Sequence, residues 1–161
     1  MNIKKRYMIA SVFLTILIVF IWANPFKKEI WDTNAKLLED KILTMEIPDE
    51  PVNLTEFTPF EWDKVYSFPA YYTKEDVYET VGYKWDRIKE TVNEGMNQIV
   101  FMKEGEVVCY IYGYPSNNKF GISFNHGEYS YGDTVLYAKD NEVFTVVKKE
   151  DVTYLNFEGE E

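Results

Sequence analysis

The side chains best suited to covalent catalysis or metal binding are scarce in this chain. Cys109 is the single cysteine and His126 the single histidine among 161 residues. A cysteine nucleophile needs a basic partner, and His126 is the one imidazole that could serve. However, Cys109 lies in an alternating run typical of a strand, and His126 lies in the turn sequence Asn-His-Gly. We therefore expect structural roles for both, and neither an internal disulfide nor a multi-histidine or cysteine-rich zinc site can form.

Carboxylates are plentiful, and Asp63 is distinguished by its neighbours. It lies between Trp62 and Lys64 in the most distinctive stretch of the sequence, where a carboxylate beside a cation could act in acid–base catalysis. The alternative is that Asp63 accepts backbone N–H bonds where a strand meets a turn. The second role is favoured, because the sequence has no nucleophile elbow, no phosphate-binding glycine loop, no metal-ligand spacing and no calcium loop. We expect no catalysis, no metal and no cofactor.

The elements that position Asp63 belong to one unit, residues 57–85. Residues 60–68 alternate, with aromatic side chains and Lys64 on one face, which predicts a half-buried strand. Pro69 ends this strand because it has no N–H to donate. We expect the Lys64 ammonium to reach water, with a cation–π contact to Trp62 or Tyr66 as the alternative. The candidate interaction residues of this unit are Trp62, Asp63, Lys64, Tyr66, Tyr71 and Tyr72.

A short helix is predicted to follow the strand. Thr73 is a suitable N-cap, and Asp76 stands at the third helical position, as in a capping box. Val77 and Val81 share one helix face. Gly82 is placed to end the helix in the left-handed conformation. Several independent local signals therefore predict the same helix.

Residues 57–73 resemble the signature of an uncharacterised family of small bacterial extracytoplasmic proteins, which are lipoprotein-like or membrane-anchored. The family pattern is roughly F-x-x-F-x-W-D-K-V-Y-x-F-x-P-Y-T, followed by a short helix that ends in Gly. This sequence matches it at Phe57, Phe60, Trp62, Asp63, Lys64, Val65, Tyr66, Phe68, Tyr71 or Tyr72, and Thr73, whereas Pro69 is displaced. A later hairpin sequence is also similar, so the resemblance covers roughly residues 54–125. It implies a location and a fold type, and it implies no activity.

The N-terminal segment has the composition of a membrane anchor. Lys4, Lys5 and Arg6 precede an uncharged run over residues 7–23, which is at the short end of what spans a bilayer. Basic residues before the run and an acidic chain after it place the N-terminus in the cytoplasm and the remainder outside. Secretion after signal-peptide cleavage near Ala23 is the competing interpretation. We expect a single-pass membrane protein.

Residues 29–46 have helical periodicity, with an apolar stripe formed by Trp31, Leu38, Ile42 and Met45. We expect a stalk or a helix docked on the domain. A dimerising or membrane-lying helix is the alternative, and it is disfavoured because the stripe covers only about two to three turns and carries acidic residues. Residues 47–51, with two prolines, have the composition of a linker.

The rest of the chain predicts a mainly antiparallel sheet. A second short helix is expected from Trp85 to Val92. A hairpin with one face formed by Val107, Cys109 and Ile111 should follow, with strands at 98–103 and 106–114. Later strands are expected at 120–125, 128–131, 134–139, 142–148 and 152–157. The fold class is therefore α+β, with one or two short helices packed on the sheet and an N-terminal transmembrane helix before it.

These segments divide the chain into three parts. Residues 1–28 are the anchor with its flanks, residues 29–52 a helical stalk with a linker, and residues 53–161 an extracytoplasmic α+β domain. Residues 1–28 hold five basic and no acidic side chains, which leaves 12 basic and 27 acidic side chains for the remainder. Such an acidic surface repels nucleic acid, and we expect none as a partner.

The composition favours a non-catalytic module that binds another protein of the cell envelope. An inhibitor or immunity-type protein with an acidic surface is the alternative. A glycan-binding or glycan-hydrolysing domain is less favoured, and it would show exposed aromatic rings beside two acids in one groove. A tyrosine-rich sheet face could serve in recognition or belong to the core: Tyr110, Tyr112, Tyr114, Tyr129 and Tyr131.

Overall fold

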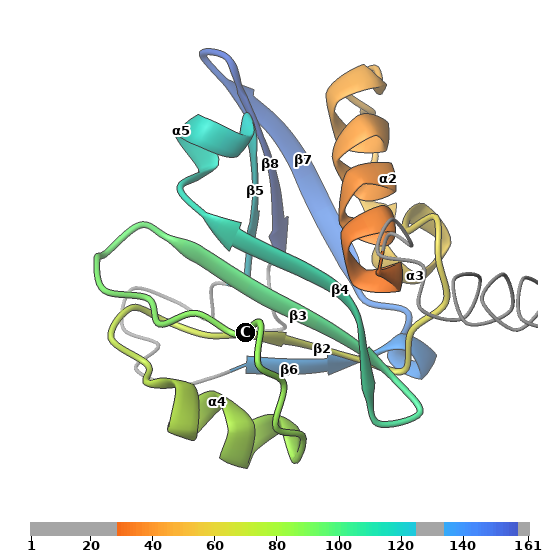
Figure 1. The fold of residues 1–161 in the computed structure, drawn as a ribbon. Helices are drawn as coiled ribbons and strands as arrows, with labels where there is room; N and C mark the ends of the chain where they lie inside the picture. Colours follow the sequence, from red (N-terminus) through yellow and green to blue (C-terminus); the bar gives the residue numbers. More distant parts are fainter. Residues whose placement is uncertain (1–28, 125–133, 158–161) are drawn as a thin grey trace, which may run out of the picture.

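The computed structural model describes residues 29–124 and 134–157, which form an α+β fold with two four-stranded sheets (Figure 1). The predicted anchor at 7–23, the predicted strand at 128–131 and His126 lie outside the described residues. Within the described ranges, no helix is both long enough and apolar enough to cross a membrane.

The first sheet has the strand order β4-β3-β2-β6, and all neighbouring strands are antiparallel. Its strands are β2 (Lys64–Ser67), β3 (Asn97–Lys103), β4 (Glu106–Gly113) and β6 (Thr134–Tyr137). Glu104 and Gly105 link β3 to β4 with φ of 52° and 84°, as in a tight two-residue hairpin turn. The predicted hairpin is confirmed.

The second sheet has the strand order β1-β7-β8-β5. Its strands are β1 (Val52–Asn53), β5 (Phe120–Ser123), β7 (Val143–Lys149) and β8 (Val152–Phe157). Only the β5–β8 pair is parallel. Pairing is thus mainly antiparallel, as expected, but it is divided between two sheets.

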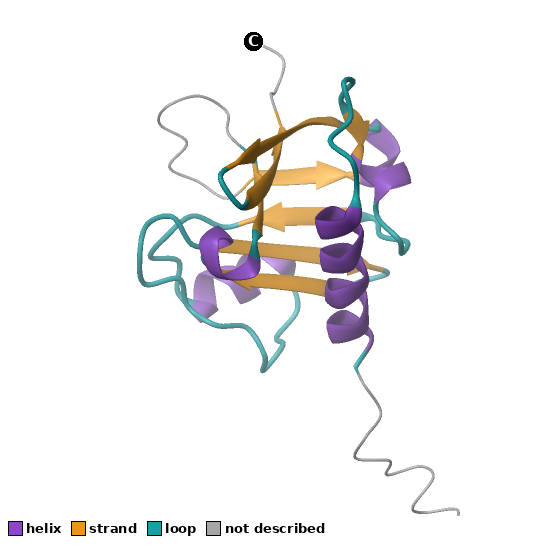
Figure 2. Ribbon diagram, turned by 90° about the horizontal axis from the view of Figure 1, so that it is seen from above, coloured by secondary structure: helices purple, strands orange, loops and turns teal. Residues whose placement is uncertain are grey.

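The longest helix within the described residues, α2 (Ile30–Thr44), packs on strand β4, and Figure 2 shows it running across the direction of the strands beside it. Leu38 and Ile42 are buried in the core, and the Asn34 side-chain amide donates to the Val108 carbonyl at 2.8 Å. This contact covers the outer edge of β4, which would otherwise offer unpaired backbone groups. Of the two arrangements expected for this helix, the structure has the docked one.

Four shorter helical segments complete the described chain. They are α3 (Leu54–Phe57), α4 (Lys74–Val81), α5 (Pro115–Asn118) and the 3-10 turn η1 (Ala138–Asp140). One apolar cluster fills the space between the two sheets and α2. A second cluster lies on the opposite face of the first sheet, under α4 (Figure 1). The first sheet is therefore a central layer that is buried on both faces.

The ends of α4 agree with the sequence. The Thr73 hydroxyl donates to Asp76 Oδ2 at 2.7 Å, and the Thr73 backbone N–H donates to the same oxygen at 3.0 Å. The Asp76 N–H donates to Thr73 Oγ1 at 3.2 Å in return, so the predicted capping box is present. Gly82 ends the helix with φ of 70°, as predicted for a left-handed cap.

This cap should make stability depend on pH. Hydrogen bonds from the Thr73 hydroxyl and backbone lower the pKa of Asp76 below its ordinary value. A lowered folded-state pKa stabilises the protein above the unfolded pKa of about 4, and this contribution is lost as the pH falls through the folded-state value. We expect Asp76→Asn to lower the melting temperature at pH 7 and to make little difference at about pH 2 to 3. Thermal melts of Asp49→Asn, an exposed carboxylate outside the helices, provide the control. If Asp76→Asn lowered the melting temperature as much at about pH 2 to 3 as at pH 7, the stabilisation would not depend on the ionised Asp76 carboxylate.

The predicted strand at residues 60–68 is wrong in its length and in its single aromatic face. β2 spans only Lys64–Ser67. Trp62 packs between the sheets, whereas Tyr66 and Phe68 pack on the α4 side. The backbone leaves the extended conformation around Asp63, so that the two-residue alternation does not continue through this point. β2 is also buried on both faces, because Val65 enters the cluster between the sheets.

The predicted common face of Val107, Cys109 and Ile111 is also wrong. Val107 lies in the α4-side cluster, whereas Cys109 and Ile111 lie between the sheets. The pairing of β3 with β4 shifts between Phe101 and Met102, so that Phe101 pairs with Cys109 and Met102 pairs with Val107. Such a β-bulge inserts one unpaired residue and reverses the facing of the residues beyond it.

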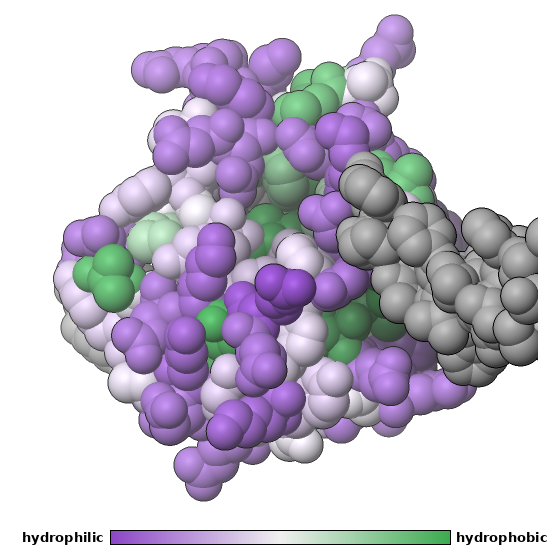
Figure 3. Space-filling model, viewed as in Figure 1, coloured by the Kyte–Doolittle hydropathy of each residue, from purple (hydrophilic) through white to green (hydrophobic). Residues whose placement is uncertain are grey.

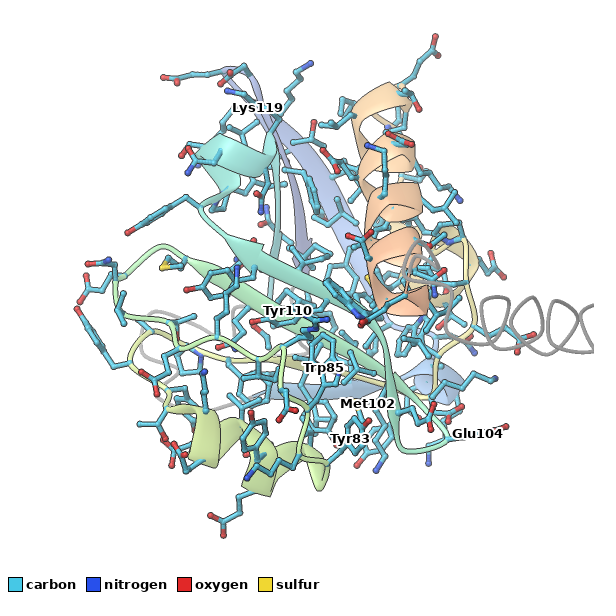
Figure 4. All side chains as sticks on the ribbon, in the orientation of Figure 1. Tyr83, Trp85, Met102, Glu104, Tyr110 and Lys119 are labelled. Atoms are coloured by element: carbon cyan, nitrogen blue, oxygen red, sulfur yellow. The ribbon has the colours of Figure 1, made fainter. Side chains whose placement is uncertain are left out.

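The predicted helix from Trp85 to Val92 is absent, and residues 83–96 form an irregular segment instead. Its carbonyl and amide groups bond to side chains of the sheet. The Lys89 N–H donates to the Tyr110 hydroxyl at 3.1 Å, and Gln98 Nε2 donates to the Lys89 carbonyl at 2.7 Å. The rings of Trp85 and Tyr110 meet edge to face at 5.3 Å (Figure 4). These contacts replace the backbone bonds of a helix.

Candidate functional site

Trp62, the centre of the sequence motif, has a structural position. Its side chain is only 5% exposed, and Nε1–H donates to Thr58 Oγ1 at 2.8 Å. The indole meets the Phe101 ring edge to face at 5.5 Å. A buried ring with its polar atom satisfied stabilises the core and leaves little surface for a partner.

Asp63 links three parts of the chain through hydrogen bonds. Its Oδ2 accepts the backbone N–H of Glu104 at 2.6 Å, in the turn between β3 and β4. Its own N–H donates to the Met102 carbonyl at 2.8 Å, and its carbonyl accepts the Ala138 N–H at 3.0 Å. Asp63 therefore has the turn-binding role that the sequence favoured for its carboxylate.

Three further motif residues also contribute mainly to structure. Lys64 is exposed, and its ammonium lies 5.7 Å from the centre of the Tyr137 ring, on the adjacent strand. The exposure of Lys64 agrees with the expectation that its ammonium reaches water, and its aromatic neighbour is Tyr137 rather than Trp62 or Tyr66, which were the alternative. Tyr66 is buried and stacks on Phe68 at 6.0 Å. The half-buried Tyr72 ring meets Phe68 at 5.7 Å.

Tyr71 differs from all other motif residues. Its side chain is 67% exposed, and its φ of 67° lies in the left-handed region, where a bulky residue is uncommon. The Tyr71 N–H donates to the Thr91 carbonyl at 2.6 Å, and the Thr91 hydroxyl donates to the Pro69 carbonyl at 2.8 Å. Val92, the next residue after Thr91, is 58% exposed. We name Tyr71 and Val92 the Tyr71 surface.

Searches against protein-family models, curated proteins and solved structures found no match to this chain. The resemblance of residues 57–73 to the extracytoplasmic family stays a prediction.

The expected tyrosine face is only partly in the described structure. Tyr110 is buried, and burial raises its pKa to about 12. Tyr112 and Tyr114 are half-buried. Tyr129 and Tyr131 lie outside the described residues. The described tyrosines of this set therefore belong in part to the core, and they do not form one open recognition face.

Reactive side chains are not gathered in the described chain. Cys109 is fully buried between the sheets, and burial raises the pKa of its thiol, which disfavours the nucleophilic thiolate. Within residues 29–124 and 134–157, no three His, Cys, Asp or Glu side chains lie close enough together to hold a metal ion.

Proposed function

We propose that this protein is a membrane-anchored extracytoplasmic module without catalytic activity, and that it binds another protein of the cell envelope through the Tyr71 surface. The conformation of Tyr71 is the observation that carries this proposal. The anchor is the uncharged run at residues 7–23, with the N-terminus in the cytoplasm.

The backbone conformation of Tyr71 is costly for its residue type. A non-glycine residue in a sparsely populated conformation costs about 1–3 kcal/mol, and Gly or Asn would reduce this cost. The exposed ring gives little core packing in return. Strain that stability does not explain favours a role in recognition, and tyrosine is among the residues enriched at the energetic centres of protein interfaces.

The surroundings hold the backbone of Tyr71 in a defined place. The bonds from Tyr71 to Thr91 and from Thr91 to Pro69 join the turn after β2 to the irregular segment at 83–96. Thr91 itself is buried. A side chain on a fixed base loses less entropy on binding than one on a free loop, so this arrangement favours a tight contact with few residues.

The charge of the chain favours a partner with a basic surface. The formal net charge is −10, with 27 acidic side chains, and complementary charge accelerates association and weakens with added salt. An inhibitor of a basic toxin or hydrolase is therefore a second candidate, and it would use the same surface.

Photo-crosslinking in native membranes tests the proposal and names the partner. A photoreactive phenylalanine analogue is placed at Tyr71 in the full chain. The control places it at Tyr137, another exposed tyrosine, at the end of β6. We expect one protein to be crosslinked from position 71 and not from position 137. Equal labelling from both positions, or labelling of lipid alone, would contradict the proposal.

Tyr71→Asn should separate binding from folding. Asn tolerates the left-handed conformation, so we expect an unchanged or raised melting temperature. Loss of the Tyr71 ring should weaken binding to the crosslinked partner by about tenfold or more, since an aromatic side chain at the energetic centre of an interface contributes about 2 kcal/mol or more. Affinity of the purified partner for this variant and for Tyr137→Ala is measured by calorimetry. Full affinity of Tyr71→Asn would show that the ring is not part of the interface.

A further inference from the structure

A groove lies on the outer face of the second sheet. It has a volume of about 510 Å³, within the range of small-ligand sites, about 300–1,000 Å³. Its floor comes from β5, β7 and β8, and its walls from the start of β3 and the corner before α5. The polar and aromatic side chains that could contact a ligand in this groove include Asn97, Tyr114, Ser123, Lys149, Tyr154 and Asn156.

Several polar side chains of the groove make no hydrogen bond to other described residues. Tyr114, Ser123, Tyr154 and Asn156 make no side-chain hydrogen bond to residues within 29–124 and 134–157. Asn97 Oδ1 accepts the Ile122 N–H at 3.0 Å, which leaves its amide N–H groups as donors. Ser123 and Asn156 occupy paired positions of β5 and β8. Hydroxyl and amide groups on rigid strands are thus gathered with two tyrosine rings.

The charge of the groove differs from that of the protein. Although the chain has 27 acidic residues, no carboxylate of the described residues lines this groove, and Lys149 is the charged side chain there. By contrast, the depression between α2 and β4, whose floor is apolar (Figure 3), is lined by Asp32 and Glu39. The groove therefore favours a ligand that is rich in hydroxyl groups and carries a negative charge.

The neighbouring strand edge is closed to a peptide. β5 is an edge strand among the described strands, and an added strand would need its free N–H and C=O groups. The Ile122 N–H is already bonded to Asn97. A Cβ built at Gly121 would lie 2.9 Å from Pro115 Cγ and 3.0 Å from Asn97 Oδ1, so these side chains stand directly against the strand. Recognition by strand addition is therefore blocked, which favours a ligand held by side chains alone.

We propose that this groove binds a short oligosaccharide with an acidic substituent. The tyrosine rings pack against the C–H faces of the sugar rings, the free amide and hydroxyl groups bond to sugar hydroxyls, and Lys149 lies near the carboxylate. The site binds without cleaving, because glycoside hydrolysis ordinarily uses a pair of carboxylates and none of the described residues supplies one there. This site is independent of the Tyr71 surface.

Calorimetry on the full chain in detergent tests this site. The probes are trisaccharides of galacturonate and of glucuronate, each compared with its carboxyl-reduced neutral counterpart. We expect at least one acidic probe to bind, and Tyr154→Ala to weaken it by about tenfold, equivalent to about 1.4 kcal/mol, at an unchanged melting temperature. Lys149→Gln should remove the preference for the acidic over the neutral probe. Tyr71→Asn and Tyr137→Ala should bind as the parent chain does.

Two results would overturn this assignment. The first is the absence of binding for all four probes at concentrations up to about 10 mM, since even a weak site with a dissociation constant below this value would be detected. The second is binding that survives both Tyr154→Ala and Asn156→Ala, because the ligand would then lie elsewhere. The Asn156 variant also covers the case in which Tyr154→Ala lowers stability, since Asn156 makes no side-chain hydrogen bond to the described residues.

Discussion

Trp62→Ala is expected to lower the free energy of unfolding by about 3–5 kcal/mol, as for other large buried aromatic residues. The indole packs against Phe101 and lies in the cluster between the sheets. Its removal leaves a cavity beside the centre of the first sheet and also deprives Thr58 Oγ1 of its donor. Urea unfolding of the full chain in detergent, followed by near-UV circular dichroism, measures the change.

Trp62→Phe distinguishes packing from hydrogen bonding. Phenylalanine keeps an aromatic ring against Phe101 but cannot donate to Thr58 Oγ1, so we expect a smaller loss of about 1–3 kcal/mol. A loss below about 1 kcal/mol for Trp62→Ala would show that the motif tryptophan does not anchor the core. If that variant also lost partner binding, the indole would belong to the interface instead.

Cys109 should react with iodoacetamide at least about a thousandfold more slowly in the folded protein than in the urea-unfolded chain. The reason is that an ordinary domain opens globally in fewer than one molecule in a thousand. The thiol is fully buried, so the reagent cannot reach it, and burial also raises its pKa, so that less of the reactive thiolate forms. Mass spectrometry of the alkylated protein over time gives both rates.

The same labelling reports on the core around Trp62. Cys109 and Trp62 belong to the same cluster, so Trp62→Ala should accelerate labelling in native buffer by a factor that matches its loss of stability. Tyr137→Ala, whose ring is partly exposed on β6, should label as slowly as the parent chain. Rapid labelling of the parent chain with an intact circular dichroism spectrum would instead indicate local opening of β4.

Local signals in the sequence predicted local structure well. The cap at Thr73 and Asp76, the Gly82 terminus and the hairpin turn all depend on bonds between residues close in sequence. The structural role of Asp63 could also be inferred, because a short carboxylate next to a turn readily accepts backbone bonds. The cap and the hairpin turn need no knowledge of the distant chain, whereas the partner of the Asp63 carboxylate, Glu104, lies 41 residues further along and could not be named from the sequence.

Features set by tertiary contacts were not predictable in the same way. The bulge that turns Val107 to the α4 side appears only when β3 and β4 are paired. The segment at 83–96 has apolar residues at helical spacing, yet its backbone groups are satisfied by Tyr110, Tyr112 and Gln98 of the sheet. Tyr71 was a candidate interaction residue, but nothing in the sequence predicts a left-handed backbone conformation at a tyrosine. The groove joins elements from five parts of the chain.

The strand order has a consequence for how the polypeptide acquires its structure during synthesis. β1 pairs with β7, β2 with β6 and β5 with β8. The strands synthesised early therefore cannot pair until strands near the C-terminus have been made. Among the described strands, β3–β4 and β7–β8 are the hairpins between consecutive strands, and of these two only β3–β4 is complete before the C-terminal strands have emerged. Such high contact order slows folding and prolongs the exposure of unpaired edges. The chain would therefore complete its sheets only in a late, concerted step, and ribosome-stalled chains ending before residue 143 should remain sensitive to protease.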